Sequence, residues 1–595
     1  MAPKPLLLVL CATAAAAKKP PHVLFLMVDS MDGRVVDPTS PVSSRVALPF
    51  LESLAKEGVN FARAYTPAPQ CVPGRAAMLT GLRTDQCRAF DNGNGIAAEP
   101  SGAVDATCAS LYDEKTCGAW AADQKHNGSL FDGVAAVAPA YDLAVIGKID
   151  MGANALTRHG NTPNFTWGTG FHSGPSLPIV TRAADVRKPT KPNPMAITND
   201  DNDHVHPEDW VAIDNCDAWL RNRDSDAPFF LHCSLNIPHP SFETNATWLE
   251  AVNWTGAGTG DWIDVDAMHP YDAYESSSKA VAGRFSDDDV AKVQRTYYAM
   301  CAEADFLLGR VGDVAKARGF WDDALVVFTS DHGEMNMEHR QVWKNSMYEA
   351  SARVPLILGG GALPAGLKRG SVETGLATLL DIFPTMMDFL GAPDPQKPLP
   401  GVELGGKSLL RKERHASVIS QYHSNMSPTA AFMIRSGTWK YVTYGRTLEA
   451  FSGYESKLYD VDADPRELRD VLQAHADVAA QLDSVLRAEL ATGPNALSPT
   501  GDYQAIDAYA KRQNKATYLR FFAGARLADR LGDHAACLAA GESREDADYD
   551  APCRFAAGNA TTLRDLFDGA YRGFDDADWA KVQAWVAEDV PGAIL

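Results

Sequence analysis

Short apolar runs that each lead to polar residues recur along the first 330 positions. Runs of this length, rich in β-branched and aromatic residues, indicate buried strands of a mostly parallel sheet. Because helical patterns such as Asp287 to about Leu308 lie between them, the alternation predicts a doubly wound α/β domain. Ligands of such sheets bind beyond the carboxyl ends of the strands, so we expect a site there. The runs are His22–Val28 before Asp29, Asp142–Ile146 before Gly147-Lys148, Phe229–Cys233 before His239, and Ala324–Thr329 before Asp331-His332.

A proline-rich stretch, Gly391–Pro400, marks a domain boundary. Beyond it, Ala431–Tyr444 predicts a hairpin with a turn at Ser436-Gly437. Asp464-Pro465-Arg466-Glu467 predicts the start of an amphipathic helix. The chain of 595 residues is long enough for one large domain and a smaller one. We therefore expect a catalytic α/β domain over 18–395, an α+β subdomain over 396–498 and a helical extension over 499–595.

The first residues resemble an export signal. Lys4 precedes the apolar run Leu6–Leu10, and Ala15-Ala16-Ala17 offers small residues for cleavage. This pattern predicts a signal peptide over residues 1–17. We expect a secreted or lysosomal protein without a membrane span, because no apolar run of about 18 residues follows.

Cysteines and glycosylation sequons agree with export. Apart from Cys11 and Cys71, the chain has eight cysteines, an even number compatible with disulfides of undetermined connectivity. Two short pairings, Cys108–Cys117 and Cys537–Cys553, fit the spacing, whereas Cys233 in its apolar run is expected to be a buried thiol. Sequons typical of a glycoprotein begin at Asn127, Asn164, Asn245, Asn253, Asn425 and Asn559.

The net charge of −21 argues against nucleic acid as a partner. A negatively charged substrate would need a local basic pocket in so acidic a protein. The charge therefore directs attention to lysines near the predicted strand ends.

The segment Cys71–Gly81 carries the sharpest chemical signal. Pro73 suits the first turn of a helix and Gly81 suits its end, which places Cys71 just before a helix N-terminus. The dipole and free N–H groups there favour an anion. By itself, this pattern fits a structural cysteine as well as a reactive one.

The predicted strand ends add metal chemistry to this cysteine. The carboxylates of Asp29 and Asp331, beside His332, suit a hard cation such as Ca²⁺ or Mg²⁺. A thiolate is a poor ligand for such a cation. The conflict disappears if Cys71 is converted into a group that bears oxygen.

Cys71-x-Pro73-x-Arg75 followed by Leu79-Thr80-Gly81 resembles the signature of the formylglycine-dependent sulfatases. The resemblance extends over roughly Pro21–Leu490 and implies an alkaline-phosphatase-like fold, a mostly parallel sheet flanked by helices. It also implies that a formylglycine-generating enzyme oxidises Cys71. One hydroxyl of the formylglycine hydrate would attack sulfur and displace an alcohol, and the other would then expel sulfate.

The same resemblance implies a role for each candidate residue. Arg75 would position the hydrate, while Lys148 and Lys344 would bind sulfate oxygens. His239 would bind sulfate or protonate the leaving oxygen. One divalent cation, calcium rather than magnesium, would be held by Asp29, Cys71, Asp331 and His332.

Two departures from the family pattern point to a subgroup. Ser30 stands where many sulfatases have a second aspartate, which leaves Asp32 as a candidate substitute. Asp150 replaces the histidine of the usual Gly-Lys-x-His motif. Together with the stretch Ser330–Ala352, these departures resemble sulfatases that remove the 2-O-sulfate of a uronate. The implied process is glycosaminoglycan degradation.

Two other functions remain open at this stage. A phosphoester hydrolase of the alkaline-phosphatase superfamily typically uses two zinc ions and more histidine ligands than this sequence offers. A non-catalytic glycan-binding protein would have an unmodified Cys71 and no need for the complete signature.

Overall fold

The computed structural model describes residues 20–92, 128–150, 204–253, 286–423, 429–445, 455–493 and 495–513, with shorter pieces between them and a helix at Asp576–Asp589. The predicted signal peptide and the pairings Cys108–Cys117 and Cys537–Cys553 lie outside the described residues. Among those described, no helix combines the length and apolarity that crossing a membrane requires.

The large domain is built on an eight-stranded sheet with the order β12-β2-β11-β9-β1-β7-β4-β5. All neighbouring strands are parallel except at β11, which runs antiparallel to β2 and β9. The four runs identified in the sequence form its centre, which confirms the predicted mostly parallel sheet. The strands are β12 Ser371–Glu373, β2 Val59–Phe61, β11 Leu356–Gly359, β9 Ala324–Ser330, β1 His22–Val28, β7 Phe229–Ser234, β4 Asp142–Gly147 and β5 Phe165–Trp167.

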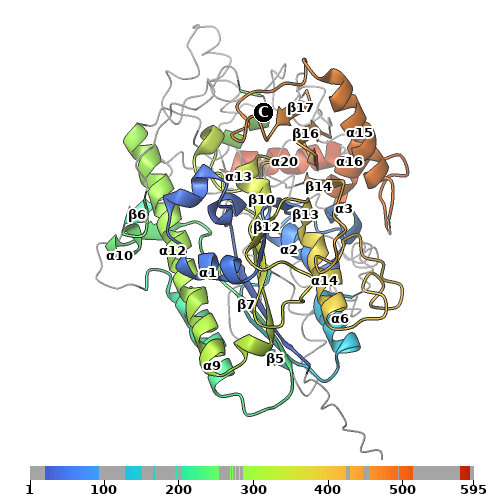
Figure 1. Ribbon diagram of the computed structural model, residues 1–595. Helices are drawn as coiled ribbons and strands as arrows, with labels where there is room; N and C mark the ends of the chain where they lie inside the picture. The colour runs from blue at the N-terminus through green and yellow to red at the C-terminus, as the bar shows by residue number, and fades with distance from the viewer. Residues whose placement is uncertain are drawn as a thin grey trace, which may run out of the picture.

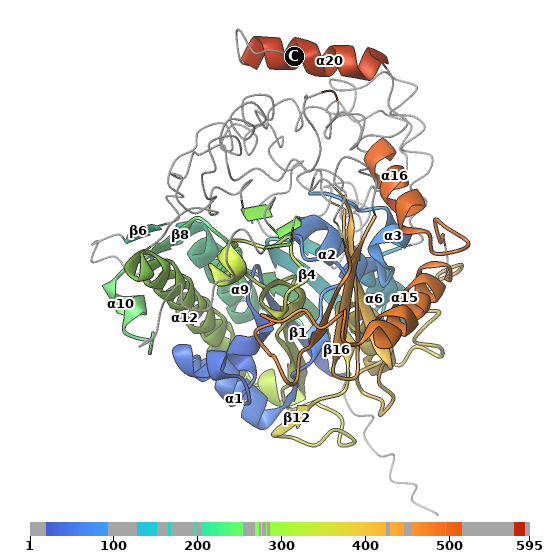
Figure 2. The ribbon, with the colours of Figure 1, turned by 90° about the horizontal axis from the view of Figure 1, so that it is seen from above.

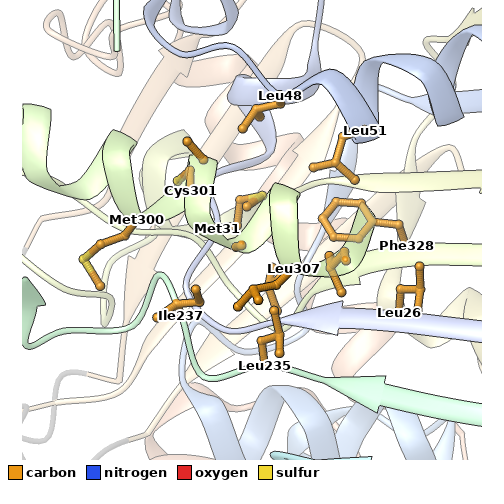
Figure 3. Close-up of a cluster of buried hydrophobic side chains, with 14 of the residues drawn as sticks. Leu26, Met31, Leu48, Leu51, Leu235, Ile237, Met300, Cys301, Leu307 and Phe328 are labelled. Atoms are coloured by element: carbon orange, nitrogen blue, oxygen red, sulfur yellow. The ribbon is translucent and has the colours of Figure 1, made fainter. Parts of the chain in front are cut away.

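Helices cover both faces of this sheet (Figure 1). One face packs against α1 Pro49–Glu57, α9 Pro207–Arg221 and α12 Asp287–Ala317; the other packs against α2 Cys71–Thr80, α6 Leu130–Val137 and α14 Ile382–Phe389. Because side chains of a strand alternate between faces, Leu26 of β1 joins Leu307 and Phe328 in the first core (Figure 3), whereas Phe25 joins the second. Burial on both faces explains why the strands are continuously apolar.

The smaller C-terminal unit is an antiparallel sheet covered by a helix on its outer side (Figure 2). The predicted hairpin is confirmed, and Gly437 adopts the positive φ of 57° that its turn requires. The predicted helix start at Asp464 is wrong, because the helix begins at Ala476 after a series of turns. The elements are β14 Ser417–Tyr422, β15 Ala431–Ser436, β16 Trp439–Tyr444, β17 Lys457–Asp460 and α15 Ala476–Leu490.

The structure overturns two expectations about covalent modification, one at Cys233 and one at Asn245. Cys233 is not a buried thiol, because it forms a disulfide with Cys216 that joins β7 to α9. The sequon asparagine Asn245 is buried and its side chain caps a short helix, so it does not present an amide for glycosylation. Asn253 is exposed and remains a candidate.

Candidate active site

The predicted site residues meet at the carboxyl edge of the central strands. Asp29 follows β1, Lys148 follows β4, and Asp331 and His332 follow β9. Cys71 opens α2, whose N-terminus approaches the same edge. Ligand atoms of four buried residues lie within 4.8 Å of one another, namely those of Asp29, Cys71, Asp331 and His332.

Cys71 lies between the imidazole and the first carboxylate of this cluster. Its Sγ is 3.3 Å from Nε2 of His332 and 3.8 Å from Oδ1 of Asp29. Burial and Asp29 raise the pKa of the Cys71 thiol, but Lys344, Lys148 and His332 outweigh them and leave the pKa below its ordinary value. The surrounding cations therefore favour negative charge at this position.

Arg75 connects the ends of four strands from its place on α2. Its Nε donates to Oδ2 of Asp331 at 2.7 Å, and Nη2 donates to Oδ2 of Asp29 at 3.3 Å and to the Val28 carbonyl at 3.5 Å. Its Nη1 donates to the Lys148 carbonyl at 2.8 Å and to Oγ of Ser234 at 3.1 Å. These contacts engage all five N–H donors of the guanidinium. Arg75 thus holds the two carboxylates in place at the edge of the sheet.

Lys148 contacts the cluster directly. Its Nζ is 2.7 Å from Oδ2 of Asp29 and 3.1 Å from Oδ1 of Asn236. Asp150, which replaces the histidine of the usual motif, has a carboxylate 3.6 Å from the same Nζ. The departure from the family pattern therefore adds a negative charge next to Lys148.

Lys344 and His239 also lie close enough to the cluster to act on Asp29. Burial raises the pKa of Asp29, but Lys148, His239, His332 and Lys344 together hold it well below its ordinary value. Lys344 is buried, and its neighbour Asn345 donates its backbone N–H to the Pro69 carbonyl at 3.1 Å, close to Cys71 in the chain. Lys344 therefore lies near Asp29 and Cys71, although more than 250 positions separate it from them in the sequence.

The loop that carries Lys344 has an unusual backbone. Six of its residues other than glycine adopt positive φ, a region that L side chains rarely occupy. Such conformations concentrate at functional sites, where the surrounding structure enforces them. The residues are Asn336, Met337, His339, Arg340, Trp343 and Asn345.

Asp32 does not join the cluster, although the sequence left it as a substitute ligand. Its carboxylate binds the guanidinium of Arg34 at 2.8 Å. Ser30 instead braces both central carboxylates, since its Oγ donates to Asp29 at 2.8 Å and its backbone N–H donates to Asp331 at 3.2 Å. The sequence gave no signal for this role beyond the position of Ser30 directly after Asp29.

The donor set fits one hard cation if Cys71 supplies oxygen. Nδ1 of His332 faces the Gly333 carbonyl at 2.9 Å, which directs Nε2 toward the cluster, an orientation typical of metal-binding histidines. Burial lowers the pKa of His332, but Asp331, Cys71 and Asp29 raise it to about 9. The cluster therefore attracts positive charge strongly, and its two carboxylates suit Ca²⁺ or Mg²⁺.

Comparison with known proteins adds independent findings. The family model described as Sulfatase matches residues 21–392, and a model for the C-terminal region of N-sulphoglucosamine sulphohydrolase matches residues 337–492. Arylsulfatase K of Rattus norvegicus is 30% identical, with 84% of this chain and 81% of the relative covered. Arylsulfatase K of Homo sapiens is 28% identical, with 85% and 87% covered.

Solved structures agree with the fold. The phosphonate monoester hydrolase of Agrobacterium radiobacter superposes with a TM-score of 0.55 at 23% identity, covering 79% of this chain and 95% of its own. A 2-O GAG sulfatase superposes with a TM-score of 0.54 at 18% identity, covering 79% and 92%. At these identities the likeness concerns architecture, and it confirms the fold class expected from the sequence.

Proposed function

The chain belongs to the sulfatase family and is a sulfuric ester hydrolase, and we propose that its substrate is the 2-O-sulfate of a uronate in glycosaminoglycan sugars. The observation that supports hydrolysis through a modified Cys71 is the convergence of Cys71 with Asp29, Asp331 and His332 at the carboxyl edge of the sheet. The substrate class rests on the sequence likeness to the arylsulfatase K relatives. It also rests on the departures at Ser30 and Asp150, which resemble those of sulfatases that remove the 2-O-sulfate of a uronate.

Cys71 is the proposed source of the nucleophile. Oxidised to formylglycine, this side chain supplies a hydroxyl for attack on sulfur and resolves the mismatch between a thiol and a hard cation. Its place at the first turn of α2 favours the negative charge that a nucleophilic oxygen develops.

The cation site consists of Asp29, Asp331, His332 and the oxygen of modified Cys71. A bound Ca²⁺ would act as a Lewis acid toward the sulfate ester. Arg75 and Ser30 hold the two carboxylates in place. The single histidine of this cluster is poorly suited to the two-zinc chemistry of phosphoester hydrolases, which disfavours that alternative.

Lys148 and Lys344 are the proposed partners of the sulfate oxygens. Both ammonium groups are buried, so their charge is little screened by water and can stabilise the negative charge that gathers during displacement. His239, half-buried and close enough to affect Asp29, donates a proton to the leaving oxygen or binds sulfate.

The proposed compartment is the secretory pathway, with delivery to lysosomes or the extracellular space. The Cys216–Cys233 disulfide supports an oxidising environment. The predicted signal peptide over residues 1–17 and the exposed sequon at Asn253 agree with that route.

Peptide mass spectrometry across Cys71 tests the mechanism on protein from its native secretory pathway. Conversion to the aldehyde lowers the peptide mass by about 18 Da. Release of sulfate from a 2-O-sulfated uronate disaccharide should accompany the shift, and Cys71→Ala should abolish that release. An unmodified thiol in a protein that still releases sulfate would overturn the formylglycine mechanism. Modified protein that cleaves phosphoesters far better than sulfate esters would overturn the proposed substrate.

A further inference from the structure

Asp150 places a carboxylate beside the lysine that is proposed to bind the sulfate ester. Its Oδ2 lies 3.6 Å from Nζ of Lys148 and 4.0 Å from Nε of Arg75. Both distances are longer than a hydrogen bond, and Nε of Arg75 already donates to Asp331 at 2.7 Å. Asp150 therefore acts on these two cations through its charge and not through a hydrogen bond to either of them.

Of the three carboxylates within 4.0 Å of the Arg75 guanidinium, that of Asp150 is the most accessible. Its side chain is 10% exposed, whereas those of Asp29 and Asp331 are 0% exposed. Asp150 also has a positive φ of 52°, a conformation that is uncommon for residues other than glycine and concentrates at functional sites. An ester that arrives from solvent therefore meets the charge of Asp150 before those of the other two carboxylates.

The ammonium group of Lys148 is shared between two carboxylates. Its Nζ lies 2.7 Å from Oδ2 of Asp29, in addition to its contact with Asp150. Burial lowers the pKa of Lys148, but Asp150, Asp29 and Cys71 raise it above its ordinary value. Lys148 is therefore charged, yet two neighbouring negative charges offset its attraction for an anion.

Sulfate and phosphate monoesters differ in charge more than in shape. A sulfate monoester carries one negative charge, whereas a phosphate monoester carries nearly two above its second pKa of about 6. The fold by itself does not select between sulfur and phosphorus, because a phosphonate monoester hydrolase shares it. A charged side chain next to the bound ester is able to make that selection.

The distance from Asp150 to a bound ester is short enough for such an effect. An ester oxygen held by Lys148 at about 2.8 Å would lie at most about 6.4 Å from Oδ2 of Asp150. With an effective dielectric constant of about 20, two unit charges at this separation repel by the equivalent of about a hundredfold in an equilibrium constant. Screening by a bound cation and by water reduces this repulsion, so we expect an effect of about tenfold for each additional negative charge.

We propose that Asp150 is a specificity-determining residue, which favours sulfate monoesters by repelling the second negative charge of a phosphate monoester. This assignment rests on the proposed function, since it takes Lys148 to bind the oxygens of the ester. It does not depend on which sugar carries the sulfate.

Steady-state kinetics with three aryl esters at about pH 8 test this role. They are 4-nitrophenyl sulfate, 4-nitrophenyl phosphate, and methyl 4-nitrophenyl phosphate, a diester that contains phosphorus but has one negative charge. For each phosphorus ester, kcat/KM is divided by that of the sulfate ester. Asp150→Asn should raise this ratio about tenfold for the phosphate monoester and change it by less than about twofold for the diester.

Two further variants serve as controls. Asp32→Asn removes the same charge from a buried carboxylate that is paired with Arg34, so both ratios should stay within about twofold of the wild-type values. Asp150→Gly guards against loss of folding, because glycine adopts a positive φ without strain, and it should show the same selective rise as Asp150→Asn.

Two results would overturn the assignment of Asp150. One is an unchanged ratio for the phosphate monoester in the folded Asp150 variants, as expected if Asp150 only holds Lys148 in place. The other is an equal rise for the diester, which would mean that the variants respond to phosphorus and not to charge. Wild-type protein that prefers the phosphate monoester to the sulfate ester would instead overturn the proposed function, and the role of Asp150 with it.

Discussion

Two buried aspartates that follow β1 differ in their partners, and the difference separates the proposed metal ligand Asp29 from Asp32, which has a structural role. Asp29 faces Cys71, His332 and Lys148, whereas Asp32 is paired with Arg34. Both side chains are almost fully buried. Their different surroundings make them a matched pair for substitution.

We expect Asp29→Asn to weaken calcium binding on the order of tenfold or more, because it replaces a charged ligand by a neutral one. Asp32→Asn should leave the calcium affinity within about twofold of the wild-type value, because the Asp32 carboxylate is already paired with Arg34. Isothermal titration with Ca²⁺ measures both. Equal weakening in the two variants would contradict the assignment of Asp32 to a structural role.

The sequence predicted which side chains converge but not how they are supported. Cys71 and Arg75 belong to one short motif, and Asp29 and Asp331 end apolar runs, so local pattern was sufficient to find them. The bracing by Ser30 depends on a contact with Asp331, 301 positions away. Contacts across such separations leave no local pattern, and neither does the full engagement of the Arg75 guanidinium.

At the scale of elements, the C-terminal sheet holds the segment that follows Lys344. Lys440 of β16 donates to the Met347 carbonyl at 2.9 Å, and its Nζ is 2.7 Å from Glu349 and 2.8 Å from Glu467. All of these groups are buried. The segment that follows Lys344 is thus anchored by the smaller unit.

Lys440→Met should destabilise the protein by about 3–5 kcal/mol, because it leaves the buried Glu467 without its cation and removes one of the cations paired with the buried Glu349. The control is Lys407→Met, whose partner Glu413 is 75% exposed and whose loss should cost less than about 1 kcal/mol. Urea unfolding measures both. In an assay without denaturant, at a temperature where the Lys440→Met variant remains folded, its kcat should also be lower than that of the wild type. Equal stability of the two variants would show that the buried cluster does not anchor the loop.

The same cluster explains the misplaced helix. Asp464-Pro465 and Glu467 form a capping pattern, yet Glu467 turns to Lys440 and accepts the Glu349 backbone N–H. Its φ of 54° is incompatible with a helix. Tertiary contacts therefore override a local signal here, whereas the hairpin at Gly437 was predictable because its turn depends on that residue alone.

At the scale of the whole molecule, the pH dependence of stability bears on the compartment. His232 of β7 lies in the core, with its ring centroid 5.0 Å from that of Phe25 and 5.9 Å from that of Phe131. Burial, with a contribution from Arg75, lowers its pKa from 6.5 to about 3. Between these values the unfolded chain binds a proton that the folded chain does not, so this residue favours unfolding increasingly as pH falls below 6.5.

Buried carboxyls act in the opposite direction. Burial raises the pKa of Asp209 and Asp305 to about 7. Their folded forms hold protons that the unfolded chain releases, so they add stability as pH falls from 7 toward 4. The total pH dependence is therefore a balance, and only a comparison between variants isolates one group.

His232→Phe removes the titrating group and keeps an aromatic ring beside Phe25 and Phe131. The free energy of unfolding of the variant, relative to wild type, should rise by about 2 kcal/mol between pH 7 and pH 5, as expected for a pKa displaced well below 5. Any change in packing is the same at both pH values and cancels in this difference. Denaturant unfolding at the two pH values measures it, and a difference that does not vary with pH would show that folding does not lower the pKa of His232. A difference that rises as pH falls means that neutral, buried His232 lowers the free energy of unfolding at acidic pH. In an acidic lysosome the buried carboxyl groups of Asp209 and Asp305 would have to offset this loss.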